Sequence, residues 1–235
     1  MNNKRYCWLS CSALVLVLIL VTAQSLLAQL LPLESGKFRL HKFEQAIGEE
    51  SYTIKRDGDS IVVNTTFEFT DRGTEVPLTA VLRTRRDLTP TNFSIKGSVS
   101  RFSTIDSSVD ITGQTATIRE GTSTRKMAAP ERFFTISGYA PTTVQMMLVR
   151  YLLTHKASGP LITLPGGEVT LEHRGKDKIK VNDKDVELDR YSVSGLIWGR
   201  ESLWFDSTQN LVAAVTVDAE FDHFESLRDG YEAAL

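Results

Sequence analysis

The residues of this chain that could do chemistry are few and widely spaced. Its four histidines are His41, His155, His173 and His223, and no two of them lie within five positions of each other. Zinc motifs such as His-x-His or His-Glu-x-x-His need closer spacing, because their ligands must share one face of a strand or helix. The sequence also has no glycine-rich phosphate loop and no Gly-x-Ser-x-Gly nucleophile motif. We therefore predict no catalytic residues, no metal site and no cofactor.

Aromatic and charged residues are concentrated between Tyr191 and Asp206. Trp198 and Trp204 flank two charged residues, so a short turn between two strands would direct both indole rings to the same interior. An arginine can stack on a tryptophan ring, and a neighbouring glutamate can form an ion pair with that arginine or with another basic side chain. The alternative is a hairpin whose aromatic side chains only fill the core. The candidate ligand-binding residues are Trp198, Arg200, Glu201, Trp204 and Tyr151.

The elements that would position these residues are mostly strands. From Lys37 to Glu120, apolar and β-branched residues alternate with polar ones in short runs bounded by Gly, Asp, Asn and Pro. Asp57-Gly58 and Gly113-Gln114 are typical of tight hairpin turns. The alternation returns between Leu161 and Val217. We predict a mainly β fold, either a curved antiparallel sheet or an open β-barrel, with one central helix and a C-terminal helix.

The central helix is predicted to begin near Pro141 and to end before Gly159-Pro160. Alternatively, Thr142 is the N-cap and forms a capping box with Gln145. One apolar stripe predicts that the helix packs on the concave side of the sheet, with its methionines as core residues. The stripe consists of Val144, Met147, Leu148, Tyr151 and Leu152.

A second helix is predicted at the C-terminus. Phe221, Phe224, Leu227 and Tyr231 have helical spacing, and the helix would run towards Leu235.

The N-terminus is typical of a secretory signal. Lys4 and Arg5 precede an uncharged apolar run from 13 to 21, and small residues follow at Ala23 and Ala28. We predict cleavage after Ala28, with Ala23 as the alternative site, and therefore an exported protein in the periplasm or outside the cell. The chain then divides into a signal peptide, 1–28, and a single β-rich domain, 29–235. An uncleaved membrane anchor is the other interpretation, because the apolar segment from 11 to 31 could just span a bilayer.

Composition limits the partners. The net charge is −2, and removal of Lys4 and Arg5 takes it to −4 because no acidic residue precedes Glu34. A mildly acidic chain argues against nucleic acid as a partner. Both cysteines, Cys7 and Cys11, lie in the signal, so the predicted mature chain has no thiol for a disulfide, for catalysis or for metal binding. After cleavage we expect no membrane span.

Several short motifs extend over nearly the whole predicted mature chain: Phe133-Phe134, Gly138-Tyr139-Ala140-Pro141, Arg150-Tyr151, Leu164-Pro165-Gly166-Gly167, His173-Arg174-Gly175, the segment 195–201 and Leu211-Val212-Ala213-Ala214. In this combination the sequence resembles the N-terminal region of certain exported bacterial amidohydrolases. The resemblance implies a β-rich accessory domain that precedes a metal-dependent hydrolase barrel. That barrel is missing here, and no metal ligand of the family matches a position in this chain. A more distant similarity, through Leu203-Trp204-Phe205-Asp206, is to periplasmic curved-sheet proteins of unknown function.

Three functions follow from these observations. The first is a non-catalytic accessory domain that docks to an amidohydrolase catalytic domain through the predicted helix Phe221–Leu235. The second is a carrier or binder of a hydrophobic small molecule or lipid, which would use the concave face of the sheet. An open apolar cavity would favour a carrier, and an interior packed by the central helix would count against it. The third is that the chain is part of a hydrolase that acts on amide bonds.

Overall fold

The structure is a computed structural model, and it describes residues 33–71, 73–98, 104–137, 141–196, 199–217 and 223–231. Fifteen strands form one sheet, in the spatial order β8-β7-β6-β5-β4-β3-β2-β1-β15-β14-β13-β12-β11-β10-β9. The strands of the first wing are β1 (Glu34–Lys42), β2 (Gln45–Asp57), β3 (Ser60–Asp71), β4 (Thr74–Arg85), β5 (Pro90–Ser98), β6 (Thr104–Thr112), β7 (Thr115–Glu120) and β8 (Ser123–Ala128). Those of the second wing are β9 (Phe133–Thr135), β10 (Leu161–Leu164), β11 (Glu168–Val181), β12 (Lys184–Ser194), β13 (Arg200–Phe205), β14 (Leu211–Val217) and β15 (His223–Arg228).

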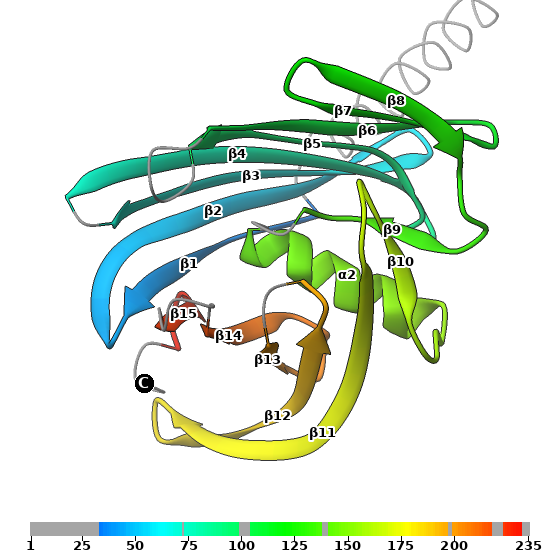
Figure 1. The fold of residues 1–235 in the computed structure, drawn as a ribbon. Helices are drawn as coiled ribbons and strands as arrows, with labels where there is room; N and C mark the ends of the chain where they lie inside the picture. Colours follow the sequence, from blue (N-terminus) through cyan, green and yellow to red (C-terminus); the bar gives the residue numbers. More distant parts are fainter. Residues whose placement is uncertain are drawn as a thin grey trace, which may run out of the picture.

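The two wings meet in the middle of the sheet, where the first strand, β1, pairs with the last, β15. Neighbouring strands are antiparallel except for β9 and β10, which are parallel. Parallel neighbours need a crossover connection, and helix α2 (Thr142–Thr154) supplies it. Figure 1 shows the sheet curled around α2, with the first wing on one side of the helix and the second wing on the other. The predicted curved sheet with one central helix is confirmed.

The core is formed by the inward-facing apolar side chains of the strands, which pack against helix α2. Ten of the thirteen residues of α2 are buried, so the helix is enclosed on nearly every side rather than along one stripe. Met146 and Val149, which lie outside the predicted stripe, are fully buried, and Figure 1 shows that α2 is enclosed between the two wings. One apolar cluster joins α2 to both wings, and includes Phe38 and Phe93 from the first wing and Leu203 from the second.

Glycines allow the first wing to curl. A Cβ atom at Gly48 in β2 would lie 2.1 Å from the carbonyl oxygen of Glu68 in β3. A Cβ atom at Gly97 in β5 would lie 2.2 Å from the carbonyl oxygen of Pro77 in β4. Glycine within a strand permits such close approach of neighbouring backbones.

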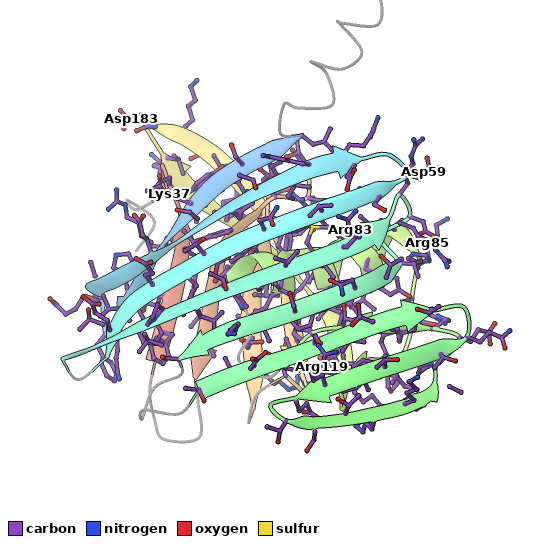
Figure 2. The ribbon with its side chains drawn as sticks, turned by 90° about the horizontal axis from the view of Figure 1, so that it is seen from above. Lys37, Asp59, Arg83, Arg85, Arg119 and Asp183 are labelled. Atoms are coloured by element: carbon purple, nitrogen blue, oxygen red, sulfur yellow. The ribbon has the colours of Figure 1, made fainter. Side chains whose placement is uncertain are left out.

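The outer face of the first wing is charged, as the view in Figure 2 shows. Arg83 pairs with Asp57 at 2.7 Å, and Arg86 pairs with Asp59 at 2.9 Å. The predicted hairpin turn at Gly113-Gln114 is confirmed. The turn predicted at Asp57-Gly58 lies one residue further along the chain, at Gly58-Asp59.

The predicted C-terminal helix is wrong in the part of it that the structure describes. His223–Arg228 is strand β15, which pairs with β1 through Leu227 and Arg39 and with β14 through Leu227 and Ala213. Pairing with two neighbouring strands outweighs the local helical spacing of the apolar residues. The remaining residues of the prediction, 221–222 and 232–235, lie outside the described residues.

Candidate functional site

The residues predicted to form a ligand site lie on two different faces of the sheet. Along β13, Glu201, Leu203 and Phe205 are buried and face α2, so Arg200 and Trp204 face outward. The Trp204 indole N–H donates a hydrogen bond to Asp177 Oδ2 at 2.8 Å. The Arg200 guanidinium donates to Glu172 Oε2 at 3.2 Å. Trp198 lies outside the described residues.

Glu201 faces the interior and contacts the helix. Its carboxylate is 1% exposed and accepts hydrogen bonds from Gln145 Nε2 at 3.1 Å and from the Thr216 hydroxyl at 2.9 Å, both at Oε1. Oε2 has no hydrogen-bond partner among the described residues. Burial raises the pKa of Glu201 and outweighs the two donors, which act in the opposite direction.

Tyr151 is also buried, but it lies six residues beyond Gln145 on α2, which is about 9 Å along the helix axis. Its ring packs 5.5 Å from that of Phe134 and 4.3 Å from that of His155, measured between centroids. Burial raises the pKa of its phenol. The fold therefore places Tyr151 and Glu201 in the interior, at separate points along α2, and leaves Arg200 and Trp204 outside.

A second buried acid, Glu50 of β2, holds the N-terminus of α2. Its carboxylate, 0% exposed, accepts the backbone N–H of Thr142 at Oε2 and that of Thr143 at Oε1, each at 2.7 Å, and the Thr143 hydroxyl also donates to Oε1. Pro141 is the N-cap residue and offers no side-chain acceptor, so Glu50 satisfies the free N–H groups of the first turn. The predicted capping box between Thr142 and Gln145 is wrong, because these side chains bind Ser226 and Glu201 instead.

Among the described residues, the partners of the Glu50 carboxylate are hydrogen-bond donors of the helix and include no cation. Desolvation raises its pKa to about 7, although the donors from Thr142 and Thr143 act in the opposite direction. Sequence analysis missed this residue. A signal for it exists, since Glu50 shares the strand face of Tyr52 and Ile54, an aromatic and an aliphatic residue that are both buried. A lone acid on an otherwise apolar face indicates a buried polar contact.

A third acid, Glu34 of β1, binds the other end of α2. Arg150 donates to both of its carboxylate oxygens, at 2.8 and 3.3 Å, and the Tyr52 hydroxyl donates at 2.7 Å. Arg228 lies 3.5 Å from the same carboxylate. Burial would raise the pKa of Glu34, but these donors and positive charges together hold it below the usual value.

Together these contacts attach one helix to both wings. Glu50 and Glu34 belong to the first wing, and Glu201 belongs to the second. A fourth contact, from the Thr142 hydroxyl to the Ser226 hydroxyl at 2.9 Å, reaches β15. Most of the helix surface between these points is apolar. The arrangement is a helix that polar groups hold inside a curved apolar surface.

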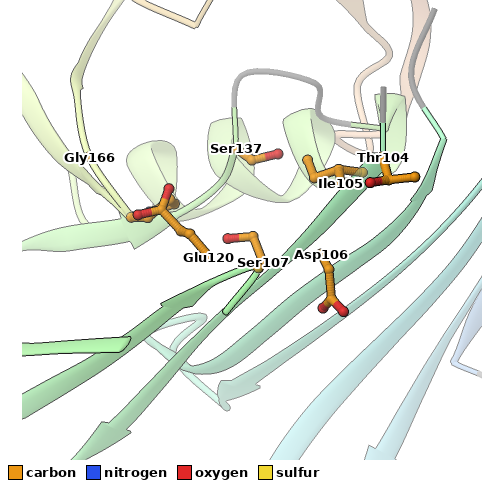
Figure 3. A pocket seen from close by; sticks show the side chains of 9 residues that line it. Thr104, Ile105, Asp106, Ser107, Glu120, Ser137 and Gly166 are labelled. Atoms are coloured by element: carbon orange, nitrogen blue, oxygen red, sulfur yellow. The ribbon is translucent and has the colours of Figure 1, made fainter. Parts of the chain in front are cut away.

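The two ends of the sheet approach each other without pairing, and a cavity of about 300 Å³ opens there. We call this place the seam. Arg125 of the edge strand β8 crosses it and donates to the carbonyl oxygen of Pro165, in the turn between β10 and β11. Figure 3 shows the cavity between β6–β7 and the segment that leads into α2. The residues that line it are Thr104, Ile105, Asp106, Ser107, Glu120, Gly121, Ser137, Pro165 and Gly166.

Within the described part of the chain, no three histidine or acidic side chains converge on a point where a metal could bind. Helix α2, with thirteen residues, is too short to cross a bilayer, and no other helix of the described ranges could do so.

No known protein family matches the sequence, and no curated protein does. Among solved structures, the chain is similar to a β-barrel-like protein of the domain of unknown function DUF1849 from Brucella abortus. The TM-score is 0.52 at 6% sequence identity, and the match covers 83% of this chain and 94% of the other. It is also compared with the hypothetical lipoprotein YmcC from Escherichia coli K12, at a TM-score of 0.30 and 11% identity, over 86% and 85% of the two chains.

These comparisons correct the resemblance inferred from short motifs. The chain shares its fold with the Brucella abortus β-barrel-like protein over nearly the whole of that protein, and no link to an amidohydrolase accessory region is found. The predicted resemblance to exported amidohydrolases is therefore wrong. Each of its motifs is short, and Gly, Pro and aromatic residues recur at turns and strand ends in many β-rich proteins. What the comparison shows is the fold, a barrel-like sheet around a helix.

Proposed function

We propose that this protein is an exported binding protein or carrier for a hydrophobic small molecule or lipid. The observation that carries the proposal is the curved apolar face of a sheet whose two end strands do not pair with each other, with a helix attached to it by polar contacts at a few points. The packed interior counts against a cavity that is open without a ligand, so the proposal has to include movement of the helix. Export is supported by the sequence pattern of residues 1–28. A curved sheet with an apolar concave side is a common container for such ligands.

Helix α2 fills that concave face in this structure, so the ligand must take over part of the surface that α2 covers. The three acids hold the helix at a few points and leave its middle held by non-directional apolar contacts. An apolar ligand would keep the sheet surface buried, but it must also compensate for the apolar side chains of α2 that lose their cover when the helix moves. The proposal therefore requires α2 to move when the ligand binds.

A disulfide that ties α2 to the sheet tests this requirement. Thr142 and Ser226 suit it, because their hydroxyl oxygens lie 2.9 Å apart across α2 and β15. The mature chain has no other cysteine if cleavage follows Ala28. We expect the wild type and the reduced Thr142→Cys/Ser226→Cys variant to bind the fluorescent apolar probe N-phenyl-1-naphthylamine equally. The oxidised variant should bind it much more weakly.

The control is a disulfide that leaves α2 free. Ser192 in β12 and Ser202 in β13 are directly opposite each other within one wing. Oxidation of the Ser192→Cys/Ser202→Cys variant should leave probe binding unchanged. Equal binding by both forms of the helix-tethered variant would refute displacement of α2, and absence of probe binding by the wild type would refute the proposed function.

A further inference from the structure

The inner face of the first wing changes character where it reaches the seam. Val109 in β6 and Ile118 in β7 are a directly opposed pair and are fully buried. The next inward-facing pair along the same strands is Ser107 and Glu120. Both line the seam cavity, and Ser137 lines it from the segment before α2. The apolar interior thus ends in a small polar chamber.

Two hydroxyl groups in this chamber lack partners. Ser107 is 7% exposed and Ser137 is 9% exposed, and neither Oγ atom has a hydrogen-bond partner among the described residues. A buried hydroxyl without a partner is unfavourable. Thr65, Ser108 and Thr135 also lack a partner among the described residues, but of these hydroxyls only those of Ser107 and Ser137 belong to residues that line the seam cavity. Two such groups at one cavity indicate that a bound molecule completes their hydrogen bonds.

The charges around the chamber favour neither an anion nor a cation. The carboxylate of Glu120 lies 3.9 Å from Arg125, whose guanidinium also donates to the Pro165 carbonyl. Asp106 points to the other side of the sheet, where it pairs with Lys96 at 3.6 Å. The cavity is therefore lined by three side chains with hydroxyl groups, Thr104, Ser107 and Ser137, and by one carboxylate with a positive neighbour. Neutral hydroxyl groups, which both donate and accept, match this set.

We infer that the seam cavity binds the neutral, polyhydroxyl head group of the hydrophobic ligand, while the ligand's apolar part lies on the concave face beside α2. This inference rests on the proposed function and specifies its ligand class. A cavity of about 300 Å³ lies at the lower end of the range of small-molecule sites. It suits a head group of the size of glycerol or one sugar.

Competition among amphiphiles that share one alkyl chain tests the inference. Dodecyl glucoside and dodecanoylglycerol carry neutral polyol heads, dodecanoate is an anion and dodecyltrimethylammonium is a cation. Each would displace N-phenyl-1-naphthylamine from the wild-type protein below its critical micelle concentration. We expect at least one of the two polyol compounds to bind about tenfold more tightly than both charged ones, since a pair of hydrogen bonds contributes on this scale.

The decisive variant is Ser107→Ala/Ser137→Ala. It should lose the preference for the polyol heads and bind all four compounds alike, while its thermal stability stays the same or rises because two unpaired hydroxyls are gone. Ser108→Ala is the matched control. Ser108 is the neighbour of Ser107, has no hydrogen-bond partner among the described residues and does not line the cavity. It should keep the preference.

The outcomes separate the two claims. Equal displacement by all four compounds in the wild type, or a preference that survives in the double alanine variant, would refute the head-group site and leave the proposed function standing. Failure of every compound to displace the probe would refute both. A preference for glucoside over glycerol, or the reverse, would identify the source of the polyol.

Discussion

The two ends of α2 are held by the same kind of side chain in opposite ways. Glu50, on β2, accepts hydrogen bonds from the first turn of the helix and has no cation partner in the part of the chain that the structure describes. Glu34, on the neighbouring strand β1, binds Arg150 near the last turn and lies close to Arg228. The pKa of Glu50 is raised to about 7, and that of Glu34 is lowered.

The difference shows that burial alone does not decide how a carboxylate titrates. Glu50 and Glu34 are both desolvated, but only Glu34 has positively charged groups, Arg150 and Arg228, beside it among the described residues. The folded state is therefore destabilised at Glu50 as pH rises, because the charged carboxylate stays desolvated even though it accepts hydrogen bonds well, and it is destabilised at Glu34 as pH falls and the pair with Arg150 loses its negative charge. If α2 must move to admit a ligand, its two ends respond to pH in opposite directions.

Loss of the Glu50 side chain should have the largest effect. Glu50→Ala leaves two buried N–H groups and a buried hydroxyl without an acceptor, and we expect a loss of about 3–4 kcal/mol in the free energy of unfolding. Urea unfolding measures it. The control is Glu49→Ala, since Glu49 is the exposed neighbour that pairs with Lys37 at 2.8 Å. Equal losses in both variants would contradict the role of Glu50.

The pH dependence of stability sharpens the comparison. The pKa of Glu50 is about 7 in the folded protein and near 4.5 in the unfolded chain, so unfolding releases a proton between these values. Stability should fall as pH rises through this window, by about 3 kcal/mol in total. Urea unfolding at a series of pH values should show this decline in the wild type and a flatter profile in Glu50→Gln. Identical profiles would mean that Glu50 titrates normally.

At the other end of the helix, Arg150→Met removes the cation that Glu34 faces. It also breaks the bonds from Arg150 to the Gln209 carbonyl and to Asn210, at 2.8 and 2.9 Å. We expect a loss of about 2 kcal/mol, since Tyr52 and Arg228 still bind Glu34. Thermal unfolding checks this value. Arg190→Met, which removes an exposed partner of Asp177, should cost less than about 1 kcal/mol.

The smallest effect on stability is expected at Glu201. Like Glu50 it is buried without a cation partner among the described residues, but only one of its oxygens is hydrogen-bonded there. Glu201→Gln keeps an oxygen that can accept from Thr216 and carries no charge that burial would desolvate. Because burial raises the pKa of Glu201, we expect the variant to become more stable relative to the wild type as pH rises and Glu201 ionises, measured by urea unfolding at a series of pH values. A marked loss at neutral pH would show that the charge itself is needed.

Much of the fold could be predicted from local patterns. Alternation identifies most of the strands, because each residue's face in a strand depends only on its position. The apolar stripe from Val144 to Leu152 identifies α2. The C-terminal segment was predicted wrongly, because its strand forms only where β1 and β14 lie on either side of it.

The candidate site was less predictable. Residues from Tyr191 to Asp206 attracted attention through their aromatic rings, but alternation in β13 directs Trp204 outward and Glu201 inward. Ser107 and Ser137 are separated by a strand pair and a crossover, and no spacing rule connects two serines that meet only at the seam. Glu50 could have been found, as an acid on the apolar face of its strand.

By itself, then, the sequence determined where chain segments extend, which faces are apolar, and that one helix lies among many strands. These properties depend on near neighbours in the chain. Only the tertiary structure decided that Glu50, Glu34 and Glu201 hold one helix, that the first and last strands pair, and that the sheet ends in a polar chamber at the seam. Those contacts join residues tens to more than a hundred positions apart, and the curvature of the sheet alone brings them together.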